Sequence, residues 1–423
     1  MARLQPVRGT HDILGETSLR FRTIFEIFKS VAERYSHKQI DTPIFEFTET
    51  FKRTLGDTSD VVTKEMYTFE DRGGELVTLR PEFTAGIARA FISNGLQQST
   101  PCKFYSFGPT FRYERPQKGR MRQFHQMDIE IIGVAEAQAD IEVLAIAQDL
   151  LMELGIAKHV KLELNSLGDQ ESRKNYRAAL VQYFSQHRDK LSKDSLIRLE
   201  KNPMRILDSK DEGDQSLIEM APRISEYYND TSKVFFTEVR EGLEGLGIDY
   251  HVNDRLVRGL DYYNKTVFEW ITDDLGAQGA VCSGGRYDGL VEKLGGRATP
   301  AVGWAMGIER LVSLYEISNE RIANPAPHIY IVTDEGKALH KGFELSEELR
   351  ESFPSLRFKL NMGGGSFKSQ LKRADKSLAI YAIIIGEEEM KNNRVGFKPL
   401  RSNEDQIDIS FENILDEVKK IFE

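Results

Sequence analysis

The sequence predicts an α+β fold built on an antiparallel sheet that is flanked by helices. Residues 102–114 and 122–134 have the composition of two strands separated by a short polar loop, which favours antiparallel pairing over an alternating βαβ plan. Residues 170–248 are more polar and mostly helical in pattern, as an inserted domain would be. Residues 318–328 contain two prolines within three residues, which is typical of a linker. A separate α/β unit is expected after this linker.

The composition is that of a globular protein from a reducing compartment. The 423 residues are 40% hydrophobic and 29% charged, which suits two or three soluble domains. No apolar run reaches about 18 residues, and residues 1–14 lack a secretory signal, so we expect a cytoplasmic protein without a membrane span. Cys102 and Cys282 lie far apart, which argues against a disulfide framework or a structural zinc site. The net charge of −9 speaks mildly against a nucleic-acid binder.

The apolar residues of the other segments recur with helical or strand periodicity. An amphipathic helix is predicted over residues 19–35 and a strand over 40–49, where Pro43 restricts the strand to an edge or an interface. The further expected elements are a strand at 76–80 before a helix start, a helix at 136–154, strands within 255–270 and 279–289, a strand and a helix within 301–316, strands at 329–332, 357–361 and 379–386, helices at 336–351 and 367–376, and a final helix.

The loop between the two paired strands is basic. Within residues 112–122, five cations accompany one acid, Glu114, although the chain as a whole is acidic. The loop is either a solvated hairpin tip or a clamp for phosphates, for which the planar fork of arginine is well suited. The cations are Arg112, Arg115, Lys118, Arg120 and Arg122.

The strand within 122–134 has one apolar and one polar face, because its side chains alternate with a period of two. The polar set is Phe124, Gln126, Asp128 and Glu130, and the other set is His125, Met127, Ile129 and Ile131. The polar face is either a solvent-facing surface or the floor of a pocket. Glu82 and Thr84 leave the same choice open, since they follow a strand end, where ligand-binding groups usually lie.

Residues 255–270 bring together an arginine, a carboxylate and two phenols, in Arg258, Asp261, Tyr262 and Tyr263. Neither a strand core nor a surface loop commonly needs this combination, which indicates a small-molecule site. Arg310, early in a predicted helix, is by itself more typical of a surface residue. No GxxxxGK[ST] pattern occurs and no GxGxxG follows a strand, so neither a P-loop nor a dinucleotide fold is indicated.

Together these motifs resemble the histidyl-tRNA synthetase family of bacterial type, within the class II aminoacyl-tRNA synthetases, over nearly the whole chain. FRYERPQKGRMRQFHQ and GWAMGIERL are similar to the second and third class-defining motifs, and the segment around Pro43 resembles the first, which lies at the dimer interface in the class. RGLDYYNKTVFEW and SGGRYDGL are similar to the two histidine-specific signatures. Phe83 departs from the pattern, which has a small residue there.

The resemblance implies a class II catalytic core at residues 1–324, interrupted by a helical insertion domain at 170–248, and an anticodon-binding domain at 325–423. It implies that L-histidine and ATP form histidyl-adenylate and pyrophosphate, and that histidine is then transferred to the 3′ end of tRNA(His). ATP is a substrate in this reaction and Mg²⁺ accompanies it, with ligands that the sequence does not identify. The resemblance further implies a homodimer.

The resemblance also assigns a role to each site residue. The predicted ligands of the α-ammonium group are Glu82, Thr84 and Gln126. The predicted contacts of the imidazole ring are Glu130 and Tyr263, with Tyr262 beside them. The predicted catalytic and ATP-binding residues are Arg258 at the carboxylate and α-phosphate, Arg112 at the α-phosphate and Arg310 at the γ-phosphate. The predicted contacts of the tRNA acceptor end are Arg115, Gln117 and Lys118.

An alternative is a synthetase-like protein that binds histidine and regulates histidine biosynthesis without charging tRNA. Such a protein is expected to lack the anticodon-binding domain and to lose signature arginines. This chain keeps Arg112, Arg258 and Arg310, together with a segment beyond the linker.

Overall fold

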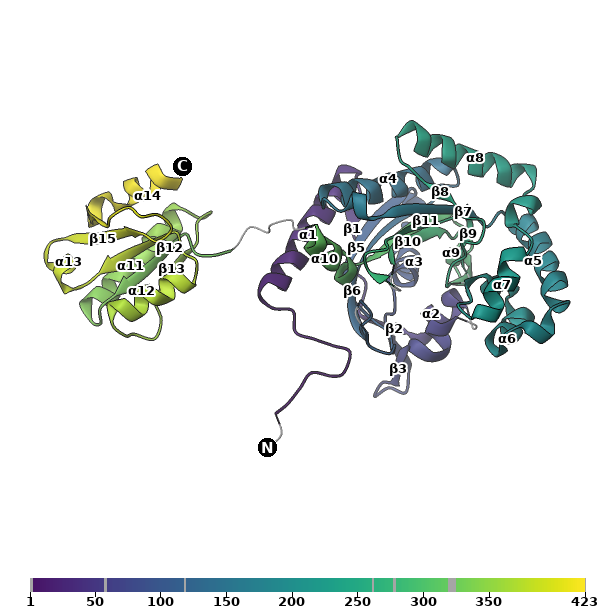
Figure 1. Ribbon diagram of the computed structural model, residues 1–423, viewed down its shortest axis with the longest axis horizontal. Coiled ribbons are helices and arrows are strands. Elements are labelled where there is room, and N and C mark those ends of the chain that lie inside the picture. Colours follow the sequence, from purple (N-terminus) through teal and green to yellow (C-terminus); the bar gives the residue numbers. More distant parts are fainter. Residues whose placement is uncertain are drawn as a thin grey trace. The chain divides into compact units, whose positions relative to one another are not determined.

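The computed structural model describes residues 3–56, 59–117, 119–260, 262–276, 279–318 and 325–422. The chain divides into two compact units, residues 1–322 and 323–423, and Figure 1 shows the elements of each. Each unit has hydrophobic clusters of its own. Among the described residues, no helix combines the length and the apolar character needed to cross a bilayer.

An eight-stranded sheet in the order β1-β5-β6-β11-β10-β9-β7-β8 forms the centre of the first unit. Its inner pairs are antiparallel, which confirms the prediction, whereas the edge pairs β1–β5 and β7–β8 are parallel. The strands are β1 (Lys38–Gln39), β5 (Cys102–Phe111), β6 (Gln123–Ile132), β7 (Lys161–Ser166), β8 (His251–Val252), β9 (Asn264–Ile271), β10 (Ala280–Arg286) and β11 (Ala301–Gly307).

Four helices cover one face of this sheet (Figure 1). The side chains of Met127, Ile129 and Ile131 from β6 are buried against them, so the apolar set of the predicted strand faces this core. The helices are α1 (Gly15–Arg34), α4 (Ala137–Glu153), α8 (Asp230–Gly245) and α10 (Ile308–Ile317).

The segment after α1 differs from the prediction. The strand predicted over 40–49 is formed only at Phe45–Phe47 (β2), and a helix begins at Thr48. The reason is that Thr48, Phe51 and Leu55 are buried at helical spacing. This helix packs with the other elements on the second face of the large sheet: α2 (Thr48–Leu55), α3 (Thr84–Ser93), α9 (Leu290–Lys293) and a small sheet of β2, β4 (Leu76–Leu79) and β3 (Tyr67–Glu70).

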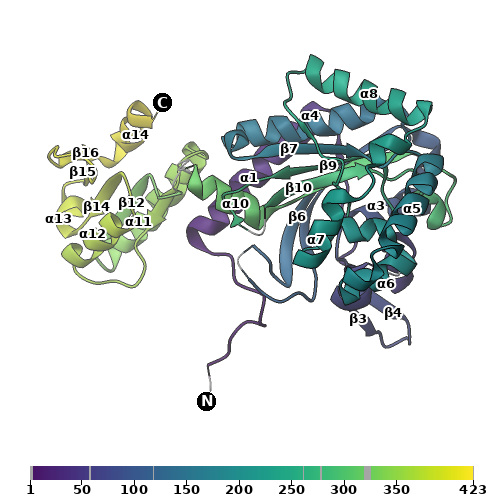
Figure 2. The ribbon, with the colours of Figure 1, turned by 45° about the vertical axis from the view of Figure 1, so that its right-hand side comes forward.

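Residues 170–245 are largely helical, and Figure 2 shows α5, α6 and α7 grouped together beside the sheet. The last helix, α8, differs from these three, because Phe236, Val239 and Leu243 belong to the core that α1 and α4 share with the sheet. Residues 170–245 are therefore joined by packing to the hydrophobic core of the first unit. The helices of the group are α5 (Gln170–Ser185), α6 (Lys193–Lys201) and α7 (Glu212–Met220).

The second unit is a five-stranded sheet in the order β13-β12-β14-β15-β16 with helices packed on it. The first three strands in this order are parallel and the others antiparallel. The helices predicted at 336–351 and 367–376 are confirmed, whereas β15, β16 and α13 were not predicted. The elements are β12 (Ile329–Thr333), α11 (Lys337–Ser352), β13 (Phe358–Leu360), α12 (Phe367–Lys376), β14 (Tyr381–Ile385), α13 (Glu387–Lys391), β15 (Arg394–Pro399), β16 (Ile407–Ser410) and α14 (Ile414–Phe422).

Candidate active site

A polar cavity of about 190 Å³ opens on the second face of the large sheet. Every residue predicted to contact histidine or ATP lines it, except Glu130. The sequence therefore identified residues that are up to about 230 positions apart in the chain but share one space. The predicted residues in the lining are Glu82, Thr84, Arg112, Gln126, Arg258, Tyr262, Tyr263 and Arg310.

The register of the sheet explains how β6 contributes to this cavity. Gln126, Asp128 and Glu130 point to the second face, opposite to the apolar set of the same strand, and all three side chains are buried. Of the two alternatives for the polar face, the structure thus supports the floor of a pocket. The cross-strand neighbours of Gln126 and Glu130 in β11 are Gly307 and Gly303.

Two glycines in adjacent strands make room for the functional side chains. Gly303 in β11 lies beside Gly285 in β10. A Cβ atom on Gly303 would collide with the Glu130 carboxylate, and one on Gly285 would lie 2.9 Å from Tyr263 Cδ1. Because real Cβ contacts are almost never this close, glycine at both positions is needed for Glu130 and Tyr263 to lie where they do.

Glu130 lies beneath the cavity lining. Its Oε1 accepts a hydrogen bond of 2.6 Å from the Thr84 hydroxyl, and its Oε2 accepts one from the Tyr287 hydroxyl. Burial raises the pKa of Glu130 to about 8, although these two hydrogen bonds act to lower it. Tyr287, which lines the cavity, was not predicted. It lies in the quoted motif SGGRYDGL, and its position after the paired glycines was the available signal.

Glu82 and Gln126 form an acceptor surface near Thr84. A Glu82 oxygen accepts a hydrogen bond of 2.9 Å from the backbone N–H of Ala85, at the amino end of α3. Burial raises the pKa of Glu82, against the hydrogen bonds from Ala85 and Thr84. Among the described residues, the buried Gln126 Oε1 has no hydrogen-bond partner. A buried acceptor without a partner is costly, so this atom is suited to a ligand donor.

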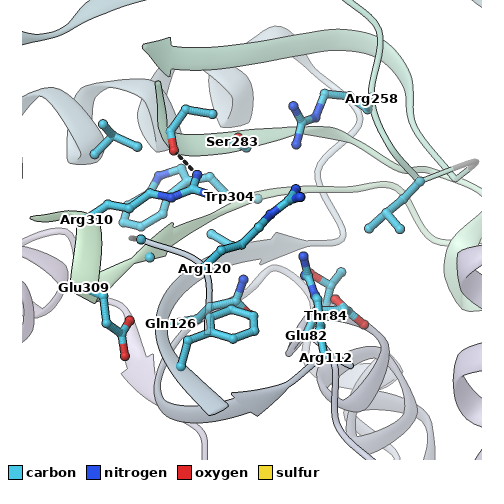
Figure 3. A pocket seen from close by; sticks show the side chains of 18 of the residues that line it. Glu82, Thr84, Arg112, Arg120, Gln126, Arg258, Ser283, Trp304, Glu309 and Arg310 are labelled. Atoms are coloured by element: carbon cyan, nitrogen blue, oxygen red, sulfur yellow. Dashed lines mark hydrogen bonds between the residues drawn. The ribbon is translucent and has the colours of Figure 1, made fainter. Parts of the chain in front are cut away.

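Four arginines surround the remainder of the cavity, and Figure 3 shows the guanidinium groups of Arg112, Arg120 and Arg258 directed toward the same space. Arg258 forms an ion pair with Glu269, and its Nε atom is buried without a hydrogen-bond partner among the described residues. Burial, and then the positive charges of Arg120 and Arg112, lower the pKa of Arg310. Such a concentration of cations favours a polyanionic ligand.

Two of these arginines are oriented by main-chain carbonyls. Arg112 Nε donates to Pro81 O at 3.0 Å, and Arg310 donates to Ala280 O, the bond drawn in Figure 3. The surface alternative for Arg310 is thereby excluded. Sequence reasoning missed Glu269, the partner of Arg258, although an acid within the apolar strand VFEW was a signal.

Two of the residues predicted to contact tRNA, Arg115 and Gln117, are exposed and are not part of the cavity lining. The third, Lys118, lies outside the described residues. Their roles remain predictions.

Phe83 does not line the cavity. Its side chain is buried in an apolar cluster, and the Arg80 Cζ atom lies 4.1 Å from the centroid of its ring.

Magnesium has no resident site of the all-protein kind in the part of the chain that the structure describes, since no group of three or more His, Cys, Asp or Glu side chains could hold an ion there. The four arginines fit the phosphates of ATP directly. Mg²⁺ usually binds through one or two carboxylates together with substrate phosphates and waters, so it does not require a group of three such side chains.

Comparisons with known proteins show which family the chain resembles over nearly its whole length. Residues 9–311 match the family model described as histidyl-tRNA synthetase, and residues 328–421 match an anticodon binding domain. The chain is 53% identical over 411 residues to the histidine–tRNA ligase of Rhodospirillum rubrum and 50% identical over 406 residues to that of Gluconobacter oxydans, with 96% of each chain covered. The structure of apo histidyl-tRNA synthetase from S. aureus matches with a TM-score of 0.83 at 34% identity, over 99% of this chain and 100% of that one.

The raised pKa of Glu130 predicts a pH-dependent stability difference. An unfolded glutamate ionises near pH 4.5, whereas Glu130 in the folded chain keeps its proton until about pH 8. Its contribution to stability is thus fully present below pH 4.5 and is lost as the pH rises toward 8, by at most about 1.4 kcal/mol per pH unit.

The variant Glu130→Gln lacks this titration. We expect the native chain to lose stability relative to this variant between pH 5 and pH 8, measured by urea unfolding of both proteins at each pH. Titrating groups that do not interact with Glu130 cancel in the difference, whereas Glu82 and Asp128 are coupled to it. A difference that stays constant across the range would show that Glu130 ionises normally.

Proposed function

The chain belongs to the histidyl-tRNA synthetase family, and we propose that its polar cavity is where histidine and ATP react. The enzyme is a histidine–tRNA ligase of translation, which activates L-histidine with ATP to histidyl-adenylate and pyrophosphate and then transfers histidine to the 3′ end of tRNA(His). The observation that carries the proposal is the meeting of four arginines with the acceptors Glu82 and Gln126 in one cavity. An amino acid carries an ammonium group and an anionic carboxylate, and ATP adds further negative charge.

Histidine would lie with its ammonium group against Glu82, Thr84 and Gln126, and with its carboxylate toward Arg258. Within the described part of the chain, neither Gln126 Oε1 nor Arg258 Nε has a hydrogen-bond partner, which supports this orientation. Each would gain the hydrogen bond that it lacks in the free enzyme.

The imidazole ring would then extend toward Tyr263 and Glu130, the two side chains for which the glycines make room. Tyr263 would contact one ring nitrogen, with Tyr262 beside it, their hydroxyls being 3.4 Å apart. Glu130 would contact the other, and the ring N–H would replace the Tyr287 hydroxyl as the donor to the Glu130 carboxylate. A site that hydrogen-bonds both ring nitrogens selects histidine. Any other amino acid would leave the buried polar groups of the site without partners, which costs binding energy.

Activation is the attack of a histidine carboxylate oxygen on the α-phosphorus of ATP, with pyrophosphate leaving on the opposite side. Both reactants are anionic, so fixed positive charge must hold them together. Arg258 would bind the carboxylate and the α-phosphate, Arg112 the α-phosphate and Arg310 the γ-phosphate. Mg²⁺, arriving with ATP, would neutralise part of the phosphate charge. No protein nucleophile is required, and positioning supplies much of the remaining rate.

The second step brings tRNA(His) to the same cavity. The exposed Arg115 and Gln117, with Lys118, would approach the acceptor end. The second unit would read the anticodon, in agreement with its family match. The exposed Lys368, Lys372 and Lys376 on α12 are suited to contact phosphates there.

Because these contacts serve translation, we place the enzyme in the cytoplasm. A non-catalytic regulatory role is less supported, since the three signature arginines are in the cavity.

The small sheet supports a homodimer. Phe45 and Phe47 in β2 are 57% and 60% exposed, and Phe69 in β3 is 48% exposed. Phe47 and Phe69 are both cross-strand neighbours of Val77 in β4, so they lie on one face. An exposed apolar face of this kind marks an interaction surface, and the family pattern around Pro43 suggests a second copy as its occupant.

The activity and the role of Arg258 can be tested together by pyrophosphate exchange with histidine and ATP. The native enzyme should be active, and Arg258→Ala should lower the exchange rate by about 10²- to 10³-fold, as the loss of a transition-state contact does. Arg258→Lys should also be poor, because an ammonium group does not reproduce the fork. The control is Arg188→Ala, which removes a surface arginine 2.7 Å from Glu200. Near-native exchange in both Arg258 variants would refute the role.

The orientation of histidine can be tested with Glu130→Gln. The KM for histidine should rise by at least about 10-fold because the amide cannot replace the carboxylate in this network, and the KM for ATP should change little. Measuring both constants for this single variant decides between the two ligands. If the ATP constant moves and the histidine constant does not, Glu130 faces the nucleotide.

The oligomeric state can be tested by sedimentation velocity at micromolar concentration. The native chain should sediment as a dimer, and Phe47→Glu should dissociate it, since a charge on the apolar face opposes its burial. The matched control is Val234→Glu on α8, which is 58% exposed away from the small sheet. A fully active native monomer would contradict the proposal.

A further inference from the structure

The loop that carries Arg258 is held by side chains from other segments. It connects β8 to β9, and residues 257–260 belong to no helix or strand. One support comes from β7, where Asn165 Nδ2 donates to Leu256 O at 3.0 Å. A second comes from the inserted helices, where Arg205 donates to Gly259 O, the carbonyl next to Arg258. The backbone is thus fixed on both sides of the arginine.

Arg205 is itself rigidly placed. It belongs to the short 3₁₀ helix Pro203–Asp208 between α6 and α7, and only 8% of the residue is exposed. Its backbone N–H donates to Asn202 O at 3.0 Å, and its carbonyl accepts from Arg198 Nη1 at 3.2 Å. A long side chain that is buried and anchored in this way can define the position of its hydrogen-bond acceptor.

The apolar packing around Arg205 continues into the cavity wall. Met204 and Ile206, its neighbours, are buried in the same cluster of side chains as Tyr262 and Tyr263. Interiors of this kind are close-packed and transmit displacements. A shift of the 3₁₀ helix would therefore reach the loop both through the Arg205 hydrogen bond and through the cluster.

A further arginine joins the same loop to the inserted helices. Here the donor lies on the loop and the acceptors lie in the inserted segment. Arg255 donates to Pro222 O at 2.9 Å, to Ala221 O at 2.7 Å and to Glu219 O at 3.1 Å, all at the carboxyl end of α7. Arg255 thus attaches the beginning of the loop, and Arg205 attaches the part beside Arg258.

We propose that Arg205 is a positioning residue for Arg258, through which the inserted helices set the rate of histidine activation. The inference rests on the proposed function of the cavity. The ion pair with Glu269 holds only part of the Arg258 guanidinium, and the direction of the side chain depends on where the loop backbone lies. Anchoring Gly259 O fixes that backbone, and catalysis is sensitive to misplacements of about 1 Å.

The test begins with Arg205→Met, which keeps most of the apolar stem and removes the donor. The turnover number for pyrophosphate exchange should fall by about 10- to 100-fold, while the KM values for histidine and ATP change by less than about 2-fold. Arg205→Lys should recover most of the rate, since one ammonium proton can replace the single N–H that reaches Gly259. The control is Arg177→Met, which removes an exposed arginine that donates to Lys201 O at 3.3 Å within the inserted helices.

A double-variant cycle separates positioning from a structural role. In an Arg258→Lys background, Arg205→Met should lower single-turnover adenylate formation by less than about 2-fold, because its effect acts through the guanidinium already removed. An equal loss in both backgrounds, or no rescue by lysine, would overturn the inference and assign Arg205 to general stability.

The outcomes also separate this inference from the proposed function. A native enzyme without exchange activity would refute both. Normal exchange in Arg205→Met, beside the loss in Arg258→Ala, would refute only the positioning role. Should Arg205→Met fail to fold, Arg205→Gln takes its place in the same cycle, because its shorter side chain also loses the bond to Gly259 O; a loss of rate that is not smaller in the Arg258→Lys background then overturns positioning.

Discussion

The burial of three carboxyl groups on one face of the sheet is the constraint around which the site is organised. Glu82, Asp128 and Glu130 are all buried, and the pKa of each is raised chiefly by that burial. Neither oxygen of Asp128 has a hydrogen-bond partner among the described residues, and the charges of Glu130 and Glu82 raise its pKa further. Arg80 and Arg112 oppose the effect. In the proposed complex, the ammonium group of histidine would supply part of the missing compensation at Glu82.

The same sheet serves two opposite requirements because its side chains alternate. One face is filled by apolar residues under α1 and α4, and this core holds the strands in register. The other face is left incompletely packed, with glycines at 285 and 303 beside large polar side chains. The apolar face therefore stabilises the sheet without lining the cavity, and the other face can keep a cavity and buried carboxyl groups.

The features of the site that depend on residues close together in the chain could be predicted from the sequence. The alternation along β6 placed Gln126 and Glu130 on one face, and the family motifs selected Arg258 and Arg310, which no periodicity could have distinguished from surface residues. What could not be predicted depends on tertiary neighbours. The Tyr287–Glu130 bond joins residues 157 positions apart, and no local pattern predicts such a contact. The missed helix at Thr48 has a different cause, since FEFTETF alternates like a strand until packing selects the helix.

The inserted helices are held to the rest of the first unit by contacts on both faces of the large sheet. Their last helix, α8, is buried against the apolar face of the sheet, whereas the 3₁₀ helix before α7 contacts the loop of Arg258 on the other face. The segment therefore contacts the first unit on both faces of the sheet, once through a packed helix and once through a buried hydrogen bond. Packed interfaces change between discrete arrangements more readily than they deform continuously. In the proposed enzyme, an inserted segment anchored in this way would carry its own position to Arg258, so it could interrupt the first unit without loosening the site.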